Sequence, residues 1–193
     1  LALAPVVKEG LIDIDIVIDS KSGVSGAGRT LSEFTHYSEV NETVQAYSVK
    51  GHRHLPEIVQ ELGQTGNMAP VITFLTHLVP ITRGILSSCY ATFKQGSFQS
   101  VGQAEEAIKD LYNDFYEQEP FIRISKSPPH TKHLLGSNFC FLYPLVDPRT
   151  ERLIVISCLD NLVKGAAGQA VQNMNVMLEL PETTGLKALA VYP

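Results

Sequence analysis

The chain has 193 residues and a mass of 21.1 kDa, a size that suits one domain or one substantial part of a larger protein. Apolar residues make up 44% of it and charged residues 18%, so it can bury a core and is not disordered. Fifteen lysines and arginines against twenty aspartates and glutamates give a net charge of -5, which argues against nucleic acid as a partner. No apolar run approaches the roughly 18 residues of a membrane span, so no membrane partner is expected either.

The first ten residues, LALAPVVKEG, are interrupted by Pro5, Lys8 and Glu9 and therefore do not make a signal peptide. They have the pattern of a helix, and position 1 is not methionine, so we expect the chain to be cut from a longer polypeptide. The three cysteines are widely spaced and include no C-x-x-C pair. This excludes a disulfide framework and favours a reducing compartment.

The first predicted elements are two strands and a short helix. In residues 12–19, isoleucine at every second position alternates mainly with aspartate, which is typical of a strand buried on one face. Residues 43–49 fit the same interpretation. Residues 56–62 predict a helix, because a proline suits the first turn and Gly63 follows the last.

Two further strands and a longer helix follow. Residues 71–79 and 85–94 have strand patterns, and the short connection between them predicts neighbouring antiparallel strands. In residues 103–118, apolar side chains recur every three or four positions, which indicates a helix with one buried face. Residues 125–133 predict an exposed loop.

The C-terminal part predicts one more strand and one more helix. Residues 153–159 are almost wholly apolar, as in a central strand covered on both faces. Residues 168–178 are apolar most of the way round, so we expect a helix buried between layers. The succession predicts an α+β fold, with a mixed, mostly antiparallel sheet and helices packed on one face.

Residues 22–29, directly after the isoleucine-rich strand, form a loop with three glycines in six positions. Glycine lets the backbone approach a ligand closely, and the serine hydroxyls, backbone N–H groups and an arginine suit an anion. The loop is neither a P-loop nor a dinucleotide fingerprint, since G-K-[ST] and G-x-G-x-x-G are absent. A flexible turn at the end of the strand is the alternative.

His52 and His54 project to one face, and Arg53 to the other, if the preceding strand continues to them. His54 lies just before a predicted helix, whose positive end favours the neutral imidazole that a general base needs. Tyr47 is close enough in sequence to reach the same place. Three interpretations remain open: a catalytic base, a zinc site without a recognisable third ligand, and histidines without function.

Residues 160–169 lead from the apolar strand into the last predicted helix. Asn161 and the glycines suit capping and leave N–H groups pointing outward, and Lys164 adds a positive charge. A capped core helix without a ligand is the alternative. Arg83, at a tight connection, is suited to a carboxylate or phosphate, or is a solvated turn residue.

The three cysteines do not offer an obvious nucleophile. Cys89, Cys140 and Cys158 lie in apolar segments and fit small buried hydrophobic residues. None lies at a helix N-terminus or a glycine-flanked turn of the kind that lowers a thiol pKa.

Four segments, in their order and spacing, resemble N-acetyl-gamma-glutamyl-phosphate reductases, which act in arginine biosynthesis. They are SGVSGAGR at 22–29, GHRHLPEI at 51–58, HLVPITRGIL at 77–86 and DNLVKGAAGQAVQNMN at 160–175. The likeness extends over the whole chain to PETTGL and VYP near its end. The second and fourth segments are the most specific.

The resemblance implies a fold and an activity. Residues 1–193 would be a catalytic and dimerisation domain like the C-terminal domain of glyceraldehyde-3-phosphate dehydrogenase, with the Rossmann NADP-binding domain absent from this chain. The family reduces N-acetyl-γ-glutamyl phosphate with NADPH, through a cysteine thioester, to N-acetylglutamate semialdehyde and phosphate. A homodimer or homotetramer is implied, and a cytoplasmic location, or the plastid stroma for a plant protein.

The resemblance also implies roles for particular residues, and no metal. His52 is the general base paired with the nucleophilic thiol. The implied substrate-binding residues are Ser22, Gly23, Ser25, Arg29, Tyr47, His54 and Arg83. The implied cofactor-binding residues are Asn161, Lys164 and Gly165.

One departure from the family matters most. The family's nucleophile lies in an N-P-G-C-Y-P-T motif a few residues before a segment like LALAPVVKEG, and this chain begins after that point. We therefore expect the chain to supply the base and the pocket but not the thiol, and to be inactive alone. The alternatives are a non-catalytic dimerisation module and a related semialdehyde dehydrogenase with another substrate.

Overall fold

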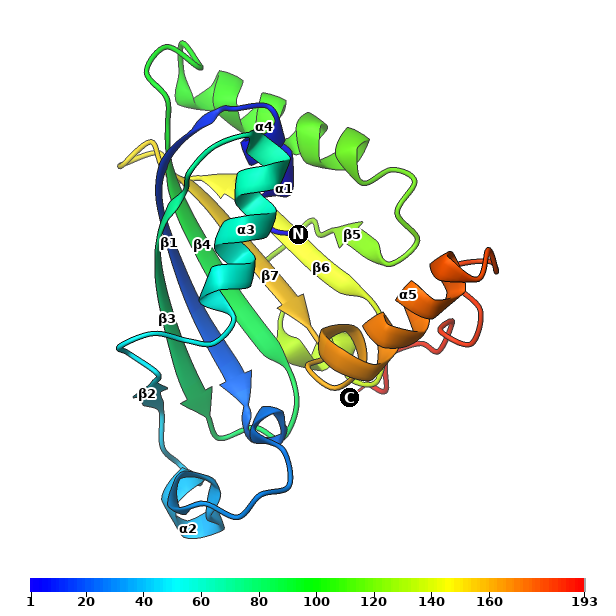
Figure 1. The fold of residues 1–193 in the computed structure, drawn as a ribbon. Coiled ribbons are helices and arrows are strands. Elements are labelled where there is room, and N and C mark those ends of the chain that lie inside the picture. Colours follow the sequence, from blue (N-terminus) through cyan, green and yellow to red (C-terminus); the bar gives the residue numbers. More distant parts are fainter. Residues whose placement is uncertain (193) are drawn as a thin grey trace.

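A mixed sheet of seven strands forms the centre of the protein (Figure 1). The computed structural model describes residues 1–192, and the strand order is β2-β3-β1-β4-β7-β6-β5. The strands are β1 (Ile12–Gly23), β2 (Gln45–Tyr47), β3 (Val71–Val79), β4 (Ile85–Phe93), β5 (Ile122–Ile124), β6 (Cys140–Val146) and β7 (Leu153–Leu159). The helices are α1 (Ala4–Lys8), α2 (Tyr37–Val40), α3 (Leu55–Gly66), α4 (Val101–Phe115) and α5 (Gly168–Met177). The predicted α+β fold with a mixed sheet is confirmed.

Strand β1 organises one half of the sheet. Its side chains Ile12, Ile16 and Ile18 are buried, as the alternation predicts. The prediction is wrong for Ile14, which is 50% exposed at a register shift in the pairing with β4. It pairs parallel with β3 and antiparallel with β4. The prediction that residues 71–79 and 85–94 are neighbours is therefore wrong, because β1 lies between them and their short connection runs across its end.

Helices α1, α3 and α4 pack on one face of the sheet (Figure 1). Their apolar sides meet the inward side chains of the strands, and the shared core includes Val7, Ile16 and Tyr112. The hydroxyls of Tyr112 and Tyr116 donate to the carbonyl oxygens of the first two residues, which fastens the start of the chain to α4. The helices therefore cover the sheet from one side.

The opposite face of the sheet, which we call the open face, keeps apolar side chains accessible. Val17 and Val71 are exposed, and Leu75, Tyr90 and Ile154 are half-buried. These positions alternate with the core residues of the same strands, so they all point away from the helices. A broad apolar surface of this kind marks an interaction site.

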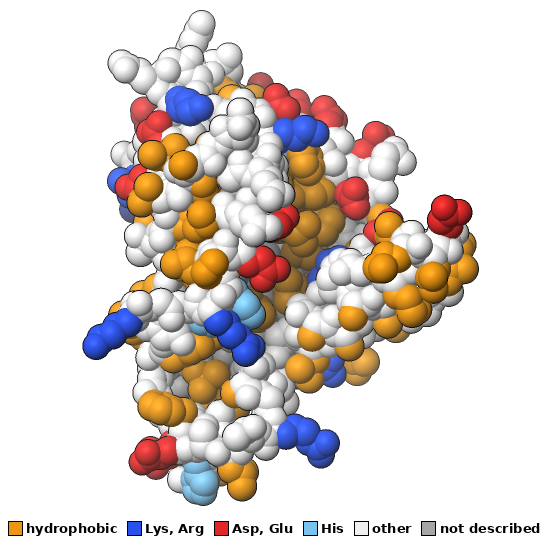
Figure 2. Space-filling model, viewed as in Figure 1, with side chains coloured by type: hydrophobic (Ala, Val, Ile, Leu, Met, Phe, Trp, Pro, Cys, Tyr) orange, Lys and Arg blue, Asp and Glu red, His pale blue; other side chains and the backbone are white. Residues whose placement is uncertain are grey.

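Helix α5 differs from its prediction. Its buried side chains are polar, Gln172 and Asn175, whereas Met174 and Met177 are exposed on the outside. The apolar composition of residues 168–178 predicted a helix that is buried on all sides. Within the part of the chain that the structure describes, this prediction is wrong, because α5 exposes its apolar side. Figure 2 shows the exposed apolar side chains gathered on the part of the surface that α5 forms.

The remaining elements differ from prediction mainly in their ends. The strand expected at residues 43–49 is limited to the three residues of β2, and the predicted helices correspond to α3 and α4 with shifted bounds. Residues 125–133 are mostly exposed, as predicted, although Pro129 is buried. Strands β5 and β6 were not predicted.

Candidate functional site

His52 lies in a turn between β2 and α3. The chain is not extended here, because the N–H of Leu55 donates to the carbonyl of His52 and begins the helix. His54 occupies the position just before α3. The two imidazole rings come together with centroids 4.9 Å apart, while Arg53 is exposed. A turn, rather than strand alternation, therefore groups the two histidines.

Aromatic rings surround the imidazole of His52. Phe74 and Tyr47 contact it edge-on, with ring centroids 5.3 and 5.7 Å away. This burial lowers the pKa of His52 below its ordinary value, and the positive charges of His54 and Arg53 lower it further. The ring is consequently neutral at pH 7, the state that can accept a proton.

One nitrogen of His52 already has a partner. The backbone N–H of His54 donates to Nδ1 at 3.2 Å. A neutral ring that accepts at Nδ1 carries its proton on Nε2. In this state Nε2 is a hydrogen-bond donor. It can accept a proton only after the hydrogen bond from the His54 N–H to Nδ1 breaks and the ring proton moves from Nε2 to Nδ1.

Arg83 is held by a buried carboxylate. Its Nη2 lies 3.0 Å from Oδ2 of Asp160, which is fully buried. Oδ1 of Asp160 also accepts from the N–H groups of Leu162 and Val163, at the start of the helical stretch Val163–Ala167. Sequence analysis missed Asp160 as a site residue, although an acidic residue directly after a buried strand was the available signal.

Asn161 joins the glycine-rich loop to the start of β4. Its Oδ1 accepts from the N–H of Gly84 at 2.7 Å, and its Nδ2 donates to Oγ of Ser25 at 2.9 Å. The side chain is buried, and both ends of its amide are engaged. Asn161 thus fixes the loop to the Arg83 turn.

Gly23 allows the loop to approach Arg83 closely. A Cβ at this position would lie 2.9 Å from the backbone nitrogen of Arg83 and from the carbonyl oxygen of Thr82. Ser22 and Ser25 beside it are half-buried, whereas Arg29, at the far end of the loop, is exposed. The structure therefore brings Ser22, Gly23 and Ser25 to Arg83, and leaves Arg29 outside this group.

The histidine group and the arginine group lie at the same end of the sheet. Tyr47 is opposite Thr76 on β3, which is opposite Ser20 on β1, and Ser22 follows two residues later on the same face. This is the face on which the helices pack, so a ligand would approach both groups from the helical side of the sheet. A neutral base and a fixed guanidinium at one end of a sheet suit chemistry on an anionic substrate.

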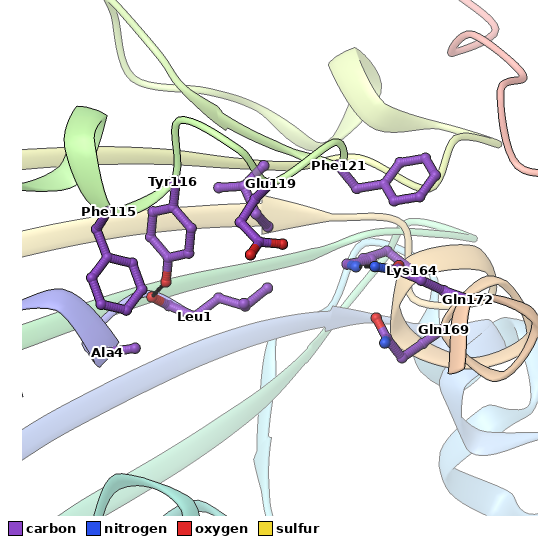
Figure 3. A pocket seen from close by; sticks show the side chains of 10 residues that line it. Leu1, Ala4, Phe115, Tyr116, Glu119, Phe121, Lys164, Gln169 and Gln172 are labelled. Atoms are coloured by element: carbon purple, nitrogen blue, oxygen red, sulfur yellow. Dashed lines mark hydrogen bonds between the residues drawn. The ribbon is translucent and has the colours of Figure 1, made fainter. Parts of the chain in front are cut away.

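Lys164 points into a cavity of about 290 Å³ beside the start of α1 (Figure 3). The residue is 7% exposed, and its Nζ donates to Oε1 of Gln172 at 2.7 Å. Desolvation lowers the pKa of Lys164. Figure 3 shows Glu119 across the cavity and Gln169 on the same side as Lys164, while Gly165 is exposed nearby.

The three cysteines are structural. Cys89, Cys140 and Cys158 are buried. Burial raises the pKa of Cys89 to about 12 and that of Cys158 to about 12, and it raises the pKa of Cys140 as well. None of them offers a reactive thiolate at neutral pH.

Residues 1–192 lack two further features, a metal-ligand cluster and a membrane-spanning helix. No three histidine, cysteine or acidic side chains in this part come together as metal ligands. None of its helices has the length and apolar character needed to cross a bilayer.

Residues 1–161 match the family described as "Semialdehyde dehydrogenase, dimerisation domain". N-acetyl-gamma-glutamyl-phosphate reductases from Dehalococcoides mccartyi, Pelotomaculum thermopropionicum and Geobacillus stearothermophilus are 55%, 51% and 50% identical to the chain. Each alignment covers 100% of the chain and 55% of the relative. The chain thus spans about half the length of the relatives it matches.

Solved structures of longer proteins have the same fold. Aspartate semialdehyde dehydrogenase II from Vibrio cholerae superposes with a TM-score of 0.66 at 16% identity, over 92% of this chain and 59% of that one. A probable aspartate-semialdehyde dehydrogenase from Pseudomonas aeruginosa gives 0.67 at 15% identity, over 92% and 58%. At these identities the likeness concerns the fold alone.

Proposed function

The chain belongs to the semialdehyde dehydrogenase dimerisation-domain family, and from this premise we propose that the complete protein is an N-acetyl-γ-glutamyl-phosphate reductase. The observation that carries the proposal is identity of 50–55% to reductases of that name over the whole chain. The site described above is consistent with it, because it combines a neutral imidazole with an oriented guanidinium.

The proposed reaction converts an acyl phosphate into an aldehyde and releases phosphate. An enzyme thiolate attacks the acyl carbon, the C–O bond to phosphate breaks, and a thioester forms. NADPH, when bound, supplies the hydride that converts the thioester into the aldehyde and returns the thiolate. The buried cysteines of residues 1–192 do not suit this role, so we assign the thiol to another part of the enzyme.

We assign the general-base role to His52. Its lowered pKa keeps the ring neutral, and Tyr47 and Phe74 shield it. To take a proton from the thiol at Nε2, the ring must first release the N–H of His54 from Nδ1. In the tautomer that accepts from His54, Nε2–H instead donates to the thiolate and stabilises it.

We assign the anionic groups of the substrate to the loop beside Arg83. Asp160 orients the guanidinium and leaves its other N–H groups available, and Nε of Arg83 is buried without a partner among residues 1–192. Ser22 and Ser25 add hydroxyl groups, and Gly23 keeps the backbone close. This combination suits a phosphate or a carboxylate. Arg29 and His54 would contribute from the exposed margin of the site.

The cofactor is assigned to the junction that follows β7. Lys164 offers N–H donors and Gln169 an amide oxygen at the cavity wall, which together fit a carboxamide, whereas the amide of Gln172 is already bonded to Lys164, Asn138 and Glu182. Exposed Gly165 permits close approach. Asn161 contributes in a different way, by holding the loop and the Arg83 turn together.

Two surfaces fit the proposed protein partners. The open face of the sheet is suited to a second copy of the chain, as the family description implies. The exposed apolar side of α5 lies after residue 161, beyond the match to the dimerisation domain. We therefore assign that side of α5 to the cofactor-binding part of the enzyme.

The test is kinetic and uses the complete enzyme. His52→Ala should lower kcat by about 10²–10⁴-fold, the usual contribution of an acid–base group, in an assay of NADPH oxidation with N-acetyl-γ-glutamyl phosphate. His54→Ala is the matched control, because it removes a neighbouring imidazole while the backbone N–H that bonds Nδ1 of His52 remains. It should affect KM more than kcat.

Other outcomes would select the alternatives. An enzyme that reduces a different acyl phosphate, but not this one, would be a related semialdehyde dehydrogenase. A protein with no reductase activity that still self-associates would be a non-catalytic dimerisation module. A His52→Ala enzyme with unchanged kcat would remove the histidine from the mechanism.

A further inference from the structure

Lys164 is a buried cation at the wall of the cavity beside α1. Its Nζ donates to Oε1 of Gln172 on α5 at 2.7 Å, and it also lies over the ring of Phe121, 5.5 Å from the ring centroid. Figure 3 shows Lys164 beside Gln172, with Glu119 across the cavity. An ammonium group has three N–H donors, so Lys164 keeps donors for a ligand in the cavity.

The amide of Gln172 links this cation to a carboxylate. Its Oε1 accepts from Lys164 and, at 2.9 Å, from Nδ2 of Asn138, while its Nε2 donates to Oε1 of Glu182. The reverse orientation of the amide would turn its nitrogen, which cannot accept, toward the ammonium. Hydrogen bonds to charged groups at both ends therefore hold the amide of Gln172 in one orientation.

Glu182 is itself fastened to α5. It belongs to residues 181–186, which we call the C-terminal turn. Nδ2 of Asn175, a buried side chain of α5, donates to the carbonyl oxygens of Glu182 and Thr184 at 3.0 and 2.9 Å. The buried side of α5 is polar because it holds both the C-terminal turn and, through Gln172, the ammonium of Lys164.

We propose that Glu182 is a positioning residue for the cofactor. Acting through Gln172, it holds the ammonium of Lys164 so that an N–H of Lys164 donates to the carboxamide oxygen of NADPH. Glu182 acts only through Gln172, because it is not one of the residues that line the cavity. This inference rests on the proposed function, which assigns the cofactor to this cavity.

The groups around Lys164 explain why a carboxylate is needed. Desolvation lowers its pKa, whereas negative charge on Cys140, Glu182 and Glu119 raises it. Burial raises the pKa of Cys140, so this thiol is neutral at pH 7 and the two carboxylates remain. Glu119 is exposed and screened by water, whereas Glu182 is half-buried and connected to Lys164 through two hydrogen bonds. Loss of the charge on Glu182 would leave Lys164 less often protonated and less well oriented.

The first experiment measures the Kd for NADPH of the complete enzyme by fluorescence titration as a function of pH. Glu182→Gln should raise this Kd about tenfold at pH 7, a loss typical of a charge-assisted hydrogen bond. Binding should also weaken at a lower pH than in the unmodified enzyme, because Lys164 loses its proton earlier. The matched control is Glu179→Gln, which removes the same charge from an exposed side chain three positions away. It should leave the Kd and its pH dependence unchanged.

An exchange of groups separates positioning from a structural role. Gln172→Glu places a carboxylate directly beside Lys164, and Glu182→Gln supplies an amide to bond that carboxylate. The double variant should bind NADPH within about threefold of the unmodified enzyme, although Glu182→Gln alone does not. If Glu182 only stabilised the C-terminal turn, the double variant would show no recovery, because position 182 is glutamine in both variants.

A second measurement needs no cofactor. In the 193-residue chain with ¹³C-labelled lysine, the NMR titration midpoint of Lys164 should fall in Glu182→Gln and recover in the double variant. Urea denaturation should show that both variants are folded.

Several results overturn the proposal. These are an unchanged Kd for NADPH in Glu182→Gln, an unchanged titration midpoint of Lys164, and a folded double variant without recovery of NADPH binding. A complete enzyme that does not bind NADPH would overturn the assignment of the cofactor and this inference with it. An enzyme whose NADPH binding depends on Glu182, but which does not reduce N-acetyl-γ-glutamyl phosphate, would support this inference and overturn only the proposed substrate.

Discussion

The carboxylate of Asp160 lies 3.0 Å from the guanidinium of Arg83, although the two residues are 77 positions apart in the chain. Asp160 is fully buried, while the Arg83 side chain is 30% exposed. The same carboxylate accepts from the N–H groups of Gly136, Leu162 and Val163. One side chain therefore connects the Arg83 turn, the Gly136 turn and the helical stretch before α5.

Asp160→Ala should lower the free energy of unfolding by about 3 kcal/mol, near the lower end for breaking a buried ion pair because Arg83 is partly hydrated. It removes a partner from one charged group and three backbone donors. Arg83→Leu should cost less, because the carboxylate keeps its three N–H partners. Urea denaturation measures both. Equal losses, or a larger loss for Arg83→Leu, would contradict this account.

Local sequence patterns predicted where the helices and strands form better than they predicted which strands lie next to each other. The isoleucine alternation located β1, because its period follows directly from the pleat. That β1 separates β3 from β4 depends on long-range pairing, which a short connection does not report. Strand β6 contains Pro144, and a proline argues against a strand because it has no N–H to donate. Only Cys140 to Leu142 of β6 pair with β5, so Pro144 lies beyond that pairing and its missing N–H is not needed there.

His52 should titrate below its ordinary value of about 6.5 in an NMR experiment on the folded chain. Burial is the main cause, so the midpoint should stay low in high salt. Arg53→Ala should raise it slightly by removing a nearby positive charge. A midpoint at or above that of the unfolded chain would show that the ring is more hydrated than the structure indicates.

The lowered pKa of His52 also makes the stability of the folded chain depend on pH. Because the folded pKa is lower, the unfolded chain binds more protons between the two pKa values, and stability rises with pH through that window. The contribution of His52 is complete above about pH 6.5 and is lost as the pH falls through the folded pKa. Comparing unfolding of the chain with that of His52→Gln from pH 5 to 7 should show a smaller pH slope in the variant.

The three cysteines should resist labelling in the folded 193-residue chain. With pKa values of about 12, Cys89 and Cys158 are ionised to roughly one part in ten thousand at pH 8, and both are buried. A thiol reagent should therefore react with none of the three in the time that it labels all three in urea. Rapid reaction of a single cysteine in the native chain would identify a thiol more accessible than the structure describes.

The candidate site was only partly predictable, because its local motifs can be recognised in the sequence but the long-range contacts between them cannot. The glycine-rich loop and the H-x-H segment stand out locally because glycine and histidine have special backbone and acid–base properties. The contact of Asn161 with Ser25 and Gly84 spans far more of the chain. Sequence patterns mark Asn161 as a junction residue, but its two partners become evident only when β1, β4 and β7 lie side by side.

Gly23→Ala tests the close approach of the loop to the Arg83 turn. The added Cβ would lie 2.9 Å from two backbone atoms, so the loop or the turn must shift, and we expect a loss of about 1–3 kcal/mol. The movement should also weaken the bond between Asn161 and Ser25, which would appear as faster amide exchange in residues 24–28. Gly102→Ala is the control, because it adds the same methyl group to α4 where nothing lies within 4 Å. The Gly102→Ala change should be neutral or stabilise the chain by up to about 1 kcal/mol. If Gly23→Ala and Gly102→Ala were equally stable in thermal unfolding, the loop would not need glycine at position 23.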